Sequence, residues 1–256
     1  MPKFHIHSSL IVATGLLLSS AQSATALEMT EIGQIQIGDG EGFAEMIRYH
    51  SESESLMVTA SETGTIERIS MSNPAMMSMM PPLDLDGGDV TAVAVHDNLV
   101  AASIKAKAAD APGMVKLFDV AGNLLASFET GALPDNVAFS PDGRYLLTAN
   151  EGEPSDDYTV DPEGSFTLID LAGGAANAKV TQISLDGIKA PAGSRIVKPG
   201  SSFAADAEPE YVAFAPDGKT AYVTLQENNA VAVIDIATAQ VTKVVGLGVK
   251  NVSRTS

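Results

Sequence analysis

One passage of this chain occurs twice in similar form. It reads PDNVAFSPDGRYLLTA at residues 134–149 and returns, without a gap, as PEYVAFAPDGKTAYVT at residues 209–224. Each copy has a run rich in β-branched and aromatic residues, a Pro-Asp-Gly turn and a second such run, which together predict a β-hairpin. Because a repeated hairpin buries its apolar face against its neighbours, the repeat favours a stacked or radial β architecture.

The turn inside the hairpin repeats its chemistry as well as its letters. In Ser140-Pro-Asp-Gly143 the proline presets φ at the second turn position, and the glycine supplies the positive φ that restarts the strand. Ala215-Pro-Asp-Gly218 is built in the same way. We expect the aspartates at strand ends to cap the following turns by accepting bonds from backbone amides. These are Asp119, Asp170 and Asp235.

Weaker copies of the pattern lie upstream of the two hairpins. Units of about four short strands, recurring every roughly 40–45 residues, are typical of the blades of a β-propeller. We therefore predict an all-β chain, a β-propeller of four-stranded antiparallel blades with about four blades present, over residues 27–250. The units are expected near residues 45–74, 90–128, 134–171 and 209–245. Residues 251–256 are expected to form an irregular tail.

In two places the units contain more residues than the repeat requires. The extra residues lie at 150–164 and at 173–207, and we interpret both segments as insertions into the repeat. Loops carried on a rigid frame are where binding sites concentrate, so these two insertions are the first places to look for one.

The first 26 residues have the features of an export signal. Lys3 opens a weakly basic start, Leu10–Leu18 form an apolar run, and Ala24-Thr25-Ala26 provides a small-x-small cleavage site. The run is too short to span a bilayer, and no later segment is long and apolar enough to do so. The sequence thus predicts a periplasmic or extracellular protein with no transmembrane segment. The absence of cysteine excludes a disulfide framework and a lipoprotein anchor.

The net charge of the chain restricts the classes of partner it can bind. Asp and Glu number 32 against 15 Lys and Arg, which gives a net charge of −17. Nucleic acids and anionic membrane surfaces require clustered basic residues, so both are disfavoured. Divalent cations that bridge carboxylates are compatible with this charge.

Carboxylates gather in the first insertion and just before the fourth unit. Calcium takes six to eight oxygen ligands on a bendable backbone, so these residues are the predicted metal ligands. The predicted ligands are Glu151, Glu153, Asp156, Asp157, Asp161, Glu163, Asp206 and Glu208. Glu210 extends the second group, and the two groups meet if consecutive blade entries share a rim. The alternative is that they form a solvated acidic loop and caps of strand entries.

Three stretches of the chain resemble the choice-of-anchor I family of exported bacterial propeller proteins with YVTN/WD-like repeats. They are residues 133–143, the acidic string 149–165 and residues 208–229. The resemblance implies a propeller fold and a surface or exported protein, and some family members carry an alkaline phosphatase label. Members of the family continue with further blades and a C-terminal anchor. The resemblance therefore implies that this chain is an N-terminal part with an incomplete ring, the alternative being a small closed ring of four blades.

Residues for catalysis are scarce. The chain has no G-x-S-x-G motif and no cysteine nucleophile, and His50 and His96 stand too far apart for a HExxH-type zinc site. We therefore predict no catalytic residues and a non-enzymatic binding or surface scaffold, whose propeller rim engages an unidentified protein or small molecule, or calcium. The alternative is a calcium-dependent phosphoesterase. Its phosphate would need the few available cations, Lys105, Lys107, Arg195 and Lys198.

One further pattern is rich in sulfur. Five methionines fall within ten residues, at positions 71, 76, 77, 79 and 80. Thioethers suit Cu(I), so copper handling is a third hypothesis. The alternative is flexible apolar filler along a blade edge, which methionine provides well.

Overall fold

The computed structural model describes residues 29–38, 44–155 and 157–248. Two compact units divide the chain, residues 1–31 and residues 32–256, and every strand belongs to the second. The predicted export signal, the ligand Asp156 and the tail at 251–256 lie outside the described residues. Among the residues that are described, no helix is long and apolar enough to cross a membrane.

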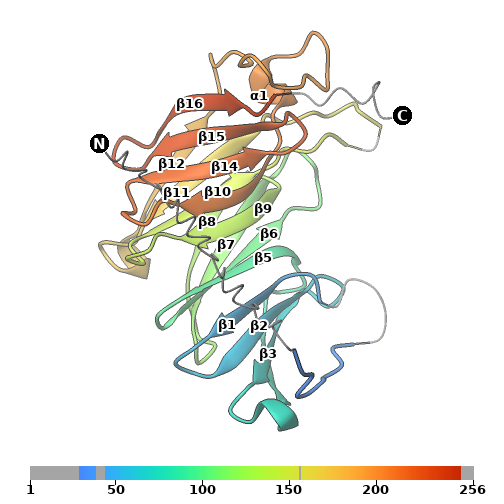
Figure 1. Ribbon diagram of the computed structural model, residues 1–256, viewed down its shortest axis with the longest axis vertical. Helices are drawn as coiled ribbons and strands as arrows, with labels where there is room; N and C mark the ends of the chain where they lie inside the picture. Colours follow the sequence, from blue (N-terminus) through green and yellow to red (C-terminus); the bar gives the residue numbers. More distant parts are fainter. Residues whose placement is uncertain (1–28, 39–43, 156, 249–256) are drawn as a thin grey trace, which may run out of the picture. The chain divides into compact units, whose positions relative to one another are not determined.

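The second unit consists of four antiparallel sheets, each of four strands paired in chain order (Figure 1). Sheet 1 holds β1 (Ile47–His50), β2 (Ser55–Ala60), β3 (Thr65–Ser70) and β4 (Ser78–Asp84). Sheet 2 holds β5 (Asp89–His96), β6 (Leu99–Lys105), β7 (Pro112–Asp119) and β8 (Leu124–Ala132). Sheet 3 holds β9 (Pro134–Phe139), β10 (Tyr145–Asn150), β11 (Ser165–Asp170) and β12 (Lys179–Ser184). Sheet 4 holds β13 (Pro209–Phe214), β14 (Thr220–Leu225), β15 (Ala230–Asp235) and β16 (Gln240–Gly246).

The repeated passage forms the same hairpin twice, as predicted. Val137 pairs with Thr148 in sheet 3, and Val212 pairs with Val223 at the matching place in sheet 4. The turns also match, since Gly143 and Gly218 have φ of 68° and 67°. A residue with a side chain is strained at such φ, so each Pro-Asp-Gly turn requires glycine at its last position.

Two outer strands were missed by the sequence analysis, so the bounds of two units were wrong. β4 extends sheet 1 to Asp84, and β12 lies inside the predicted insertion 173–207. β4 contains Pro81 and Pro82, which lack the N–H of a central strand but are tolerated at an edge. β12 buries only Ile183, so its alternating pattern is weak. The second insertion is thus confined to residues 185–208.

Apolar layers between consecutive sheets hold the unit together. Met57 of sheet 1 packs with Val93 of sheet 2 in one buried cluster, and Val115 of sheet 2 with Val137 of sheet 3 in the next. The largest cluster joins sheets 3 and 4, with Phe166 fully buried. Each such side chain contributes about 1.5–3 kcal/mol by leaving water, so neighbouring sheets stabilise one another.

Short helices complete the described structure. η1 (Pro74–Met76) and η2 (Ala175–Asn177) are single 3-10 turns that precede β4 and β12. α1 (Phe203–Asp206) lies in the second insertion and is capped by Ser202, whose hydroxyl accepts from the Ala205 amide at 3.1 Å.

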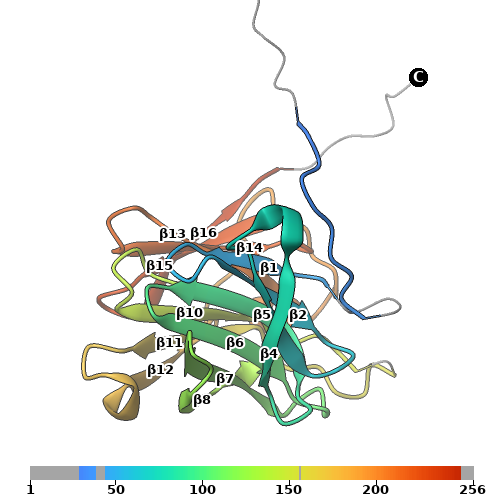
Figure 2. The same cartoon turned by 90° about the horizontal axis from the view of Figure 1, so that it is seen from below.

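The first strands of the four sheets surround a cavity of about 410 Å³. Figures 1 and 2 show the sheets in chain order, each beside the next. Arg48 of β1 donates to the hydroxyl of Tyr211 of β13 at 3.4 Å across this space. Within the described residues, buried apolar clusters join sheet 1 to 2, 2 to 3 and 3 to 4 but none joins sheet 4 to sheet 1, so these four sheets do not close into a ring.

Candidate functional site

Two equivalent bulges open the first strands of sheets 3 and 4. In β9, Pro134 pairs with Asn150 while Asn136 pairs with the preceding Ala149, which leaves Asp135 bulged. In β13 the register shifts in the same place, between Pro209 and Val212. Proline cannot donate to the strand ladder, so a bulge beside it is expected. The repeat therefore carries Asp135 and Glu210 to the same edge of adjacent sheets.

The acidic insertion begins at that edge. It follows the end of β10, and Glu151 is tied back by its amide, which donates to the Leu133 carbonyl at 2.8 Å. Gly152 then turns at φ 67°, where a Cβ would lie 2.9 Å from the backbone of Glu163. The far end is fixed as well, since the Gly164 amide donates to Ala204 at 2.9 Å. The loop is thus anchored at one end to the β8–β9 connection and at the other to α1 of the second insertion.

These carboxylates act on one another. The pKa of Glu151 is raised to about 8, first by burial and then by the charges of Asp135, Glu153, Glu208 and Glu210 in that order. Because neighbouring like charges disfavour ionisation, the five groups form one electrostatic cluster drawn from two sheets. We call Asp135, Glu151, Glu153, Glu208 and Glu210 the acidic rim.

Three other members of the acidic rim, Asp135, Glu208 and Glu210, also have raised pKa values. Burial raises the pKa of Asp135, an effect that Lys105 opposes and Glu153 reinforces. Burial also raises the pKa of Glu210, with Asp135 and Glu227 adding to the shift. Such shifts gather at functional sites, although ion-pair networks produce them too.

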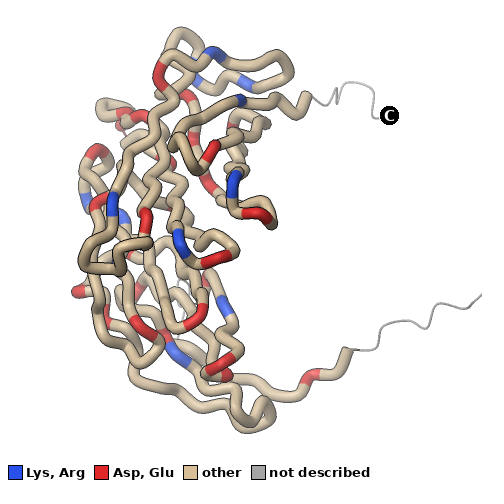
Figure 3. The backbone as a smooth tube through the Cα atoms, turned by 90° about the vertical axis from the view of Figure 1, so that its left-hand side faces the viewer, with Lys and Arg blue, Asp and Glu red and all other residues tan. Residues whose placement is uncertain are grey.

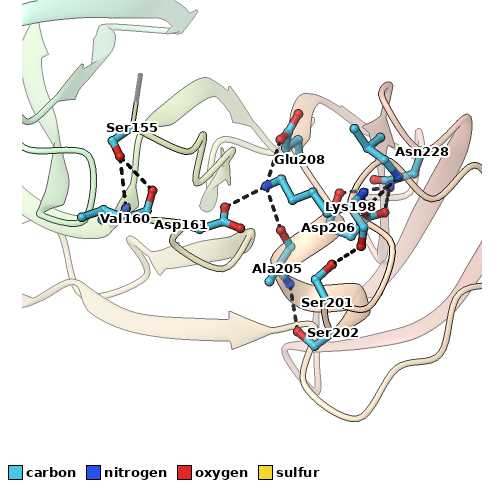
Figure 4. Close-up of polar contacts among 11 residues, drawn as sticks. Ser155, Val160, Asp161, Lys198, Ser201, Ser202, Ala205, Asp206, Glu208 and Asn228 are labelled. Atoms are coloured by element: carbon cyan, nitrogen blue, oxygen red, sulfur yellow. Dashed lines mark hydrogen bonds and ion pairs between the residues drawn. The ribbon is translucent and has the colours of Figure 1, made fainter. Parts of the chain in front are cut away.

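One lysine lies beside the acidic rim, and its charge is already taken. Lys198 Nζ lies 2.7 Å from Asp161 Oδ1 and 3.5 Å from Glu208 Oε1, and it donates to the Ala205 carbonyl at 3.1 Å (Figure 4). Burial works to lower the pKa of Lys198, but the bond to Asp161 and the two carboxylate charges outweigh it and raise the pKa. Lys198 thus links Asp161 of the first acidic group to Glu208 of the second, the two groups that meet if blade entries share a rim.

Asp206 is a structural acid. Its side chain is buried, and Oδ1 accepts from the amides of Val197 at 2.9 Å and Lys198 at 2.5 Å. Asn228, also buried, donates to Asp206 Oδ2 at 2.6 Å and to the Arg195 carbonyl at 3.3 Å. Two donors within the second insertion and Asn228 of the β14–β15 turn thus occupy this carboxylate, which leaves it little capacity for a metal ion.

Asp157 serves its own loop. It accepts from the Thr159 hydroxyl at 2.7 Å, the Ser155 hydroxyl at 2.8 Å and the Thr159 amide at 3.1 Å. These bonds, the Thr159 hydroxyl first, lower the pKa of Asp157. Such a pattern is a local turn of the kind that Asp forms with nearby amides.

The predicted calcium ligands therefore fall into separate sets. Glu151, Glu153 and Glu208 belong to the acidic rim, while Asp157, Asp161 and Asp206 are engaged elsewhere, and Glu163 is exposed. Within the described ranges, which omit Asp156, no three His, Cys, Asp or Glu residues are arranged to hold a metal ion. Calcium binding stays a prediction.

The cations that a phosphoesterase would need are largely committed. Lys105 pairs with Asp89 at 3.0 Å, Arg195 with Glu227 at 3.6 Å, and Lys198 is shared as described. Figure 3 shows acidic residues spread along the whole described backbone with few basic ones between them. This distribution offers a phosphate little attraction.

Sequence reasoning missed two contributors to this region. Asp135 was not among the predicted residues, although it occupies the position of Glu210 in the repeat. Asn228 was missed because a lone asparagine in a turn gives no signal of its partner.

The methionine strip is partly open to solvent, with Met76 76% and Met79 45% exposed.

The family model described as the Choice-of-anchor I domain matches residues 45–256. The chain belongs to the choice-of-anchor I family. The match covers all four sheets and the acidic rim. A comparison with functionally curated proteins gave no match.

Solved structures similar to this member of the choice-of-anchor I family include β-propeller domains. Hydrazine synthase of Kuenenia stuttgartiensis superposes with a TM-score of 0.58 at 17% identity, over 76% of this chain and 53% of that chain. The propeller domain of Cps50 (Swd1) from Myceliophteria thermophila gives 0.57 at 11%, over 82% and 57%. The WD40 propeller domain of Doa1 gives 0.51 at 17%, over 80% and 55%. The fold is therefore that of a propeller, and the chain spans little more than half the length of these structures.

Proposed function

We propose that this chain is an exported, non-enzymatic binding scaffold whose acidic rim takes the lysine and arginine side chains of a protein partner. The observation that carries the proposal is the acidic rim itself, in which two sheets bring five carboxylates to one edge. Lys198 and Lys105 offset only part of the repulsion among these five carboxylates, and a cationic partner relieves more of it.

Family and fold support the scaffold. Propellers use rigid sheets to present loops, and the rim loops here are pinned by backbone bonds at both ends. Among the described residues, the two histidines bond to backbone carbonyls, His50 to Asp97 and His96 to Pro141. His50 Nδ1 also lies 2.7 Å from the Ser53 hydroxyl, but its Nε2 contacts a backbone carbonyl and not an orienting carboxylate, so this pair lacks the third member of a catalytic triad.

Calcium is the other cation to consider at the same edge. It would be held by Glu151, Glu153 and Glu208, with Asp156 and Asp157 of the insertion as further oxygen donors. The paired state of Asp161 and Asp206 makes a complete cage less favourable than contact with a basic surface.

Calorimetric titration of the exported full chain tests the proposal. We expect a ten-residue lysine-rich peptide to bind, with affinity that falls steeply as salt rises. Glu151→Gln/Glu210→Gln should weaken binding by tenfold or more, as an order of magnitude. Glu52→Gln/Glu62→Gln neutralises two exposed carboxylates in turns of sheet 1 and should change little. Equal loss in both double variants would contradict a localised site.

Two further arms separate the alternatives. Calcium uptake that is lost in Asp157→Asn but kept in Glu151→Gln/Glu210→Gln would place a metal in the loop instead of the acidic rim. Calcium-dependent phosphate release from a generic phosphomonoester, abolished by Asp156→Asn/Asp157→Asn, would support the phosphoesterase. We expect no such release.

A further inference from the structure

The cavity among the first strands of the four sheets has a lining without acidic residues. The chain carries 32 Asp and Glu and has a net charge of −17, yet none of the described residues that line this cavity is acidic. Its polar lining residues are Arg48, His96, Asn136, Ser140 and Tyr211. In so acidic a chain, this lining is the opposite of the acidic rim and favours a ligand of negative charge.

Arg48 lines this cavity with a charge that no described carboxylate pairs with. Its Nη1 donates to the Ile47 carbonyl at 2.9 Å and its Nη2 to the Tyr211 hydroxyl at 3.4 Å. A guanidinium has more N–H donors than these contacts use. Arg144 and Arg195, by contrast, each pair with a carboxylate. Arg48 therefore keeps both charge and donors available for a ligand.

Two neutral donors lie near Arg48. The Tyr211 hydroxyl accepts from Arg48, and its own O–H has no acceptor among the described residues. The Asn136 side chain is 2% exposed, and its Oδ1 accepts from the Val212 amide at 3.2 Å. That bond leaves Asn136 Nδ2 without an acceptor in the described part of the chain, which is costly for a buried donor. Because Val212 directly follows Tyr211, Arg48 and Asn136 contact β13 at neighbouring residues.

The other polar lining groups are engaged, and the rest of the wall is apolar. His96 Nε2 lies 3.1 Å from a backbone carbonyl, and the Ser140 hydroxyl donates to a carboxylate of its own turn at 2.6 Å. Phe139 and Phe214, at equivalent positions of the repeat, add half-buried aromatic surface. A cavity of about 410 Å³ with a few convergent donors and apolar walls has the size and composition of a site for a small organic molecule.

We propose that this cavity binds a small organic monocarboxylate, whose carboxylate accepts from Arg48, Tyr211 and Asn136 while its apolar body lies against the two phenylalanines. A planar guanidinium matches a carboxylate through paired N–H bonds. One uncommitted cation balances one negative charge, whereas a phosphomonoester carries more than one at neutral pH and is repelled more strongly by so acidic a chain. Arg48 is not among the charges that shift the pKa of Asp135 or Glu210, so the acidic rim leaves its charge available.

Calorimetric titration of the exported full chain with phenylpropionate, a monocarboxylate with an aromatic ring, tests this proposal. We expect one probe to bind per chain with a Kd of about 1 mM or tighter, as a small ligand with one ion pair and an apolar ring can reach. Phenylpropionamide has nearly the same shape without the charge and should bind at least about tenfold more weakly. Absence of saturable binding, or equal binding of the acid and the amide, would overturn the proposal.

Variants identify the donors. Arg48→Gln should weaken binding of phenylpropionate by about tenfold or more, and Arg48→Lys, which keeps the charge but not the planar fork, should weaken it less. Tyr211→Phe removes one exposed hydroxyl and should weaken binding by about threefold. Arg144→Gln is the matched control, because Arg144 pairs with a carboxylate outside the cavity, and should bind as the wild type does. Circular dichroism confirms that each variant is folded.

The same titration separates this site from the acidic rim. Glu151→Gln/Glu210→Gln removes carboxylates that repel an anion, so the affinity for phenylpropionate should stay unchanged or rise. Weaker binding in that double variant, or wild-type affinity in Arg48→Gln, would overturn the assignment of the carboxylate to Arg48.

Discussion

The two copies of the repeated hairpin have the same turn and the same register, yet their surroundings differ. In sheet 3 the hairpin is covered on both sides, so Leu147 and Ala149 are fully buried. In sheet 4 the matching Tyr222 and Thr224 are exposed. The residues shared by the two copies form the hairpin. The residues that differ between them are apolar where a neighbouring sheet covers the face and more polar where the face is exposed.

The largest expected difference between the copies concerns burial. Leu147→Lys places a charge between sheets 3 and 4 and should cost more than about 4 kcal/mol, enough to unfold the chain. Tyr222→Lys changes the equivalent position at the surface and should alter the free energy of unfolding by less than about 0.5 kcal/mol. Denaturant unfolding of both variants measures this, and similar costs would show that the two faces are not different.

The second difference lies in the turn. Gly143→Ala and Gly218→Ala both force a side chain to positive φ, but a Cβ at 143 would lie 2.5 Å from the ring of His96, whereas the nearest atom at 218 is 3.6 Å away. Both should destabilise by about 1–2 kcal/mol. Gly143→Ala should cost about 1 kcal/mol more. His96→Ala in the same background should remove the excess, and a persistent difference would mean that the ring is not its cause.

The third difference is the residue that directly follows each hairpin. Glu151 corresponds to Gln226 in the second copy, so Glu151→Gln installs the residue that the repeat already uses there. The pKa of Glu151 is raised from 4.5 to about 8, so the folded chain holds a proton that the unfolded chain releases. Its contribution to stability is therefore full below about pH 4.5 and is lost as pH rises to about 8.

Thermal unfolding across that range measures the effect. Between pH 5 and pH 8.5 the wild-type midpoint should fall by about 2–4 °C more than that of Glu151→Gln, which corresponds to about 1 kcal/mol after screening of a partly exposed group. Parallel pH profiles would contradict the raised pKa.

The smallest difference concerns a surface pair. Arg144 Nε and Nη2 lie 3.1 and 2.9 Å from the carboxylate of Asp170, whereas in the second copy Asp235 accepts from Thr238 instead. Arg144→Ala should lower the unfolding midpoint by less than about 2 °C, and salt should reduce that shift further. Lys219→Ala is the matched control and should have no comparable effect. A larger, salt-independent shift in Arg144→Ala would indicate lost packing on Tyr145.

Local chemistry made much of the fold predictable. The Pro-Asp-Gly turns and the capping aspartates depend only on nearby residues, and Asp119 accepts from the Gly122 and Asn123 amides as expected. β4 and β12 were missed because an edge strand buries one face or less and tolerates proline. Their place is decided by pairing with the preceding strand, which no local pattern shows.

The candidate site was only partly predictable for the same reason. The sequence drew attention to the acidic insertion, and Glu151 and Glu208 do contribute to one cluster. Whether each acid is free or paired depends on contacts with distant segments, such as Lys198 with Asp161 or Asp206 with Asn228. Asp135 could have been found by comparing the copies, because it corresponds to Glu210.

Proton release on binding tests the central claim most directly, that an acidic rim built by two sheets takes cations. The measurement is calorimetric titration of the lysine-rich peptide at pH 7.5 in buffers of different ionisation enthalpy. Because the pKa of Glu151 is about 8, binding should release protons from the wild-type chain and release fewer from Glu151→Gln. Absence of binding, or equal proton release by the two proteins, would contradict the account.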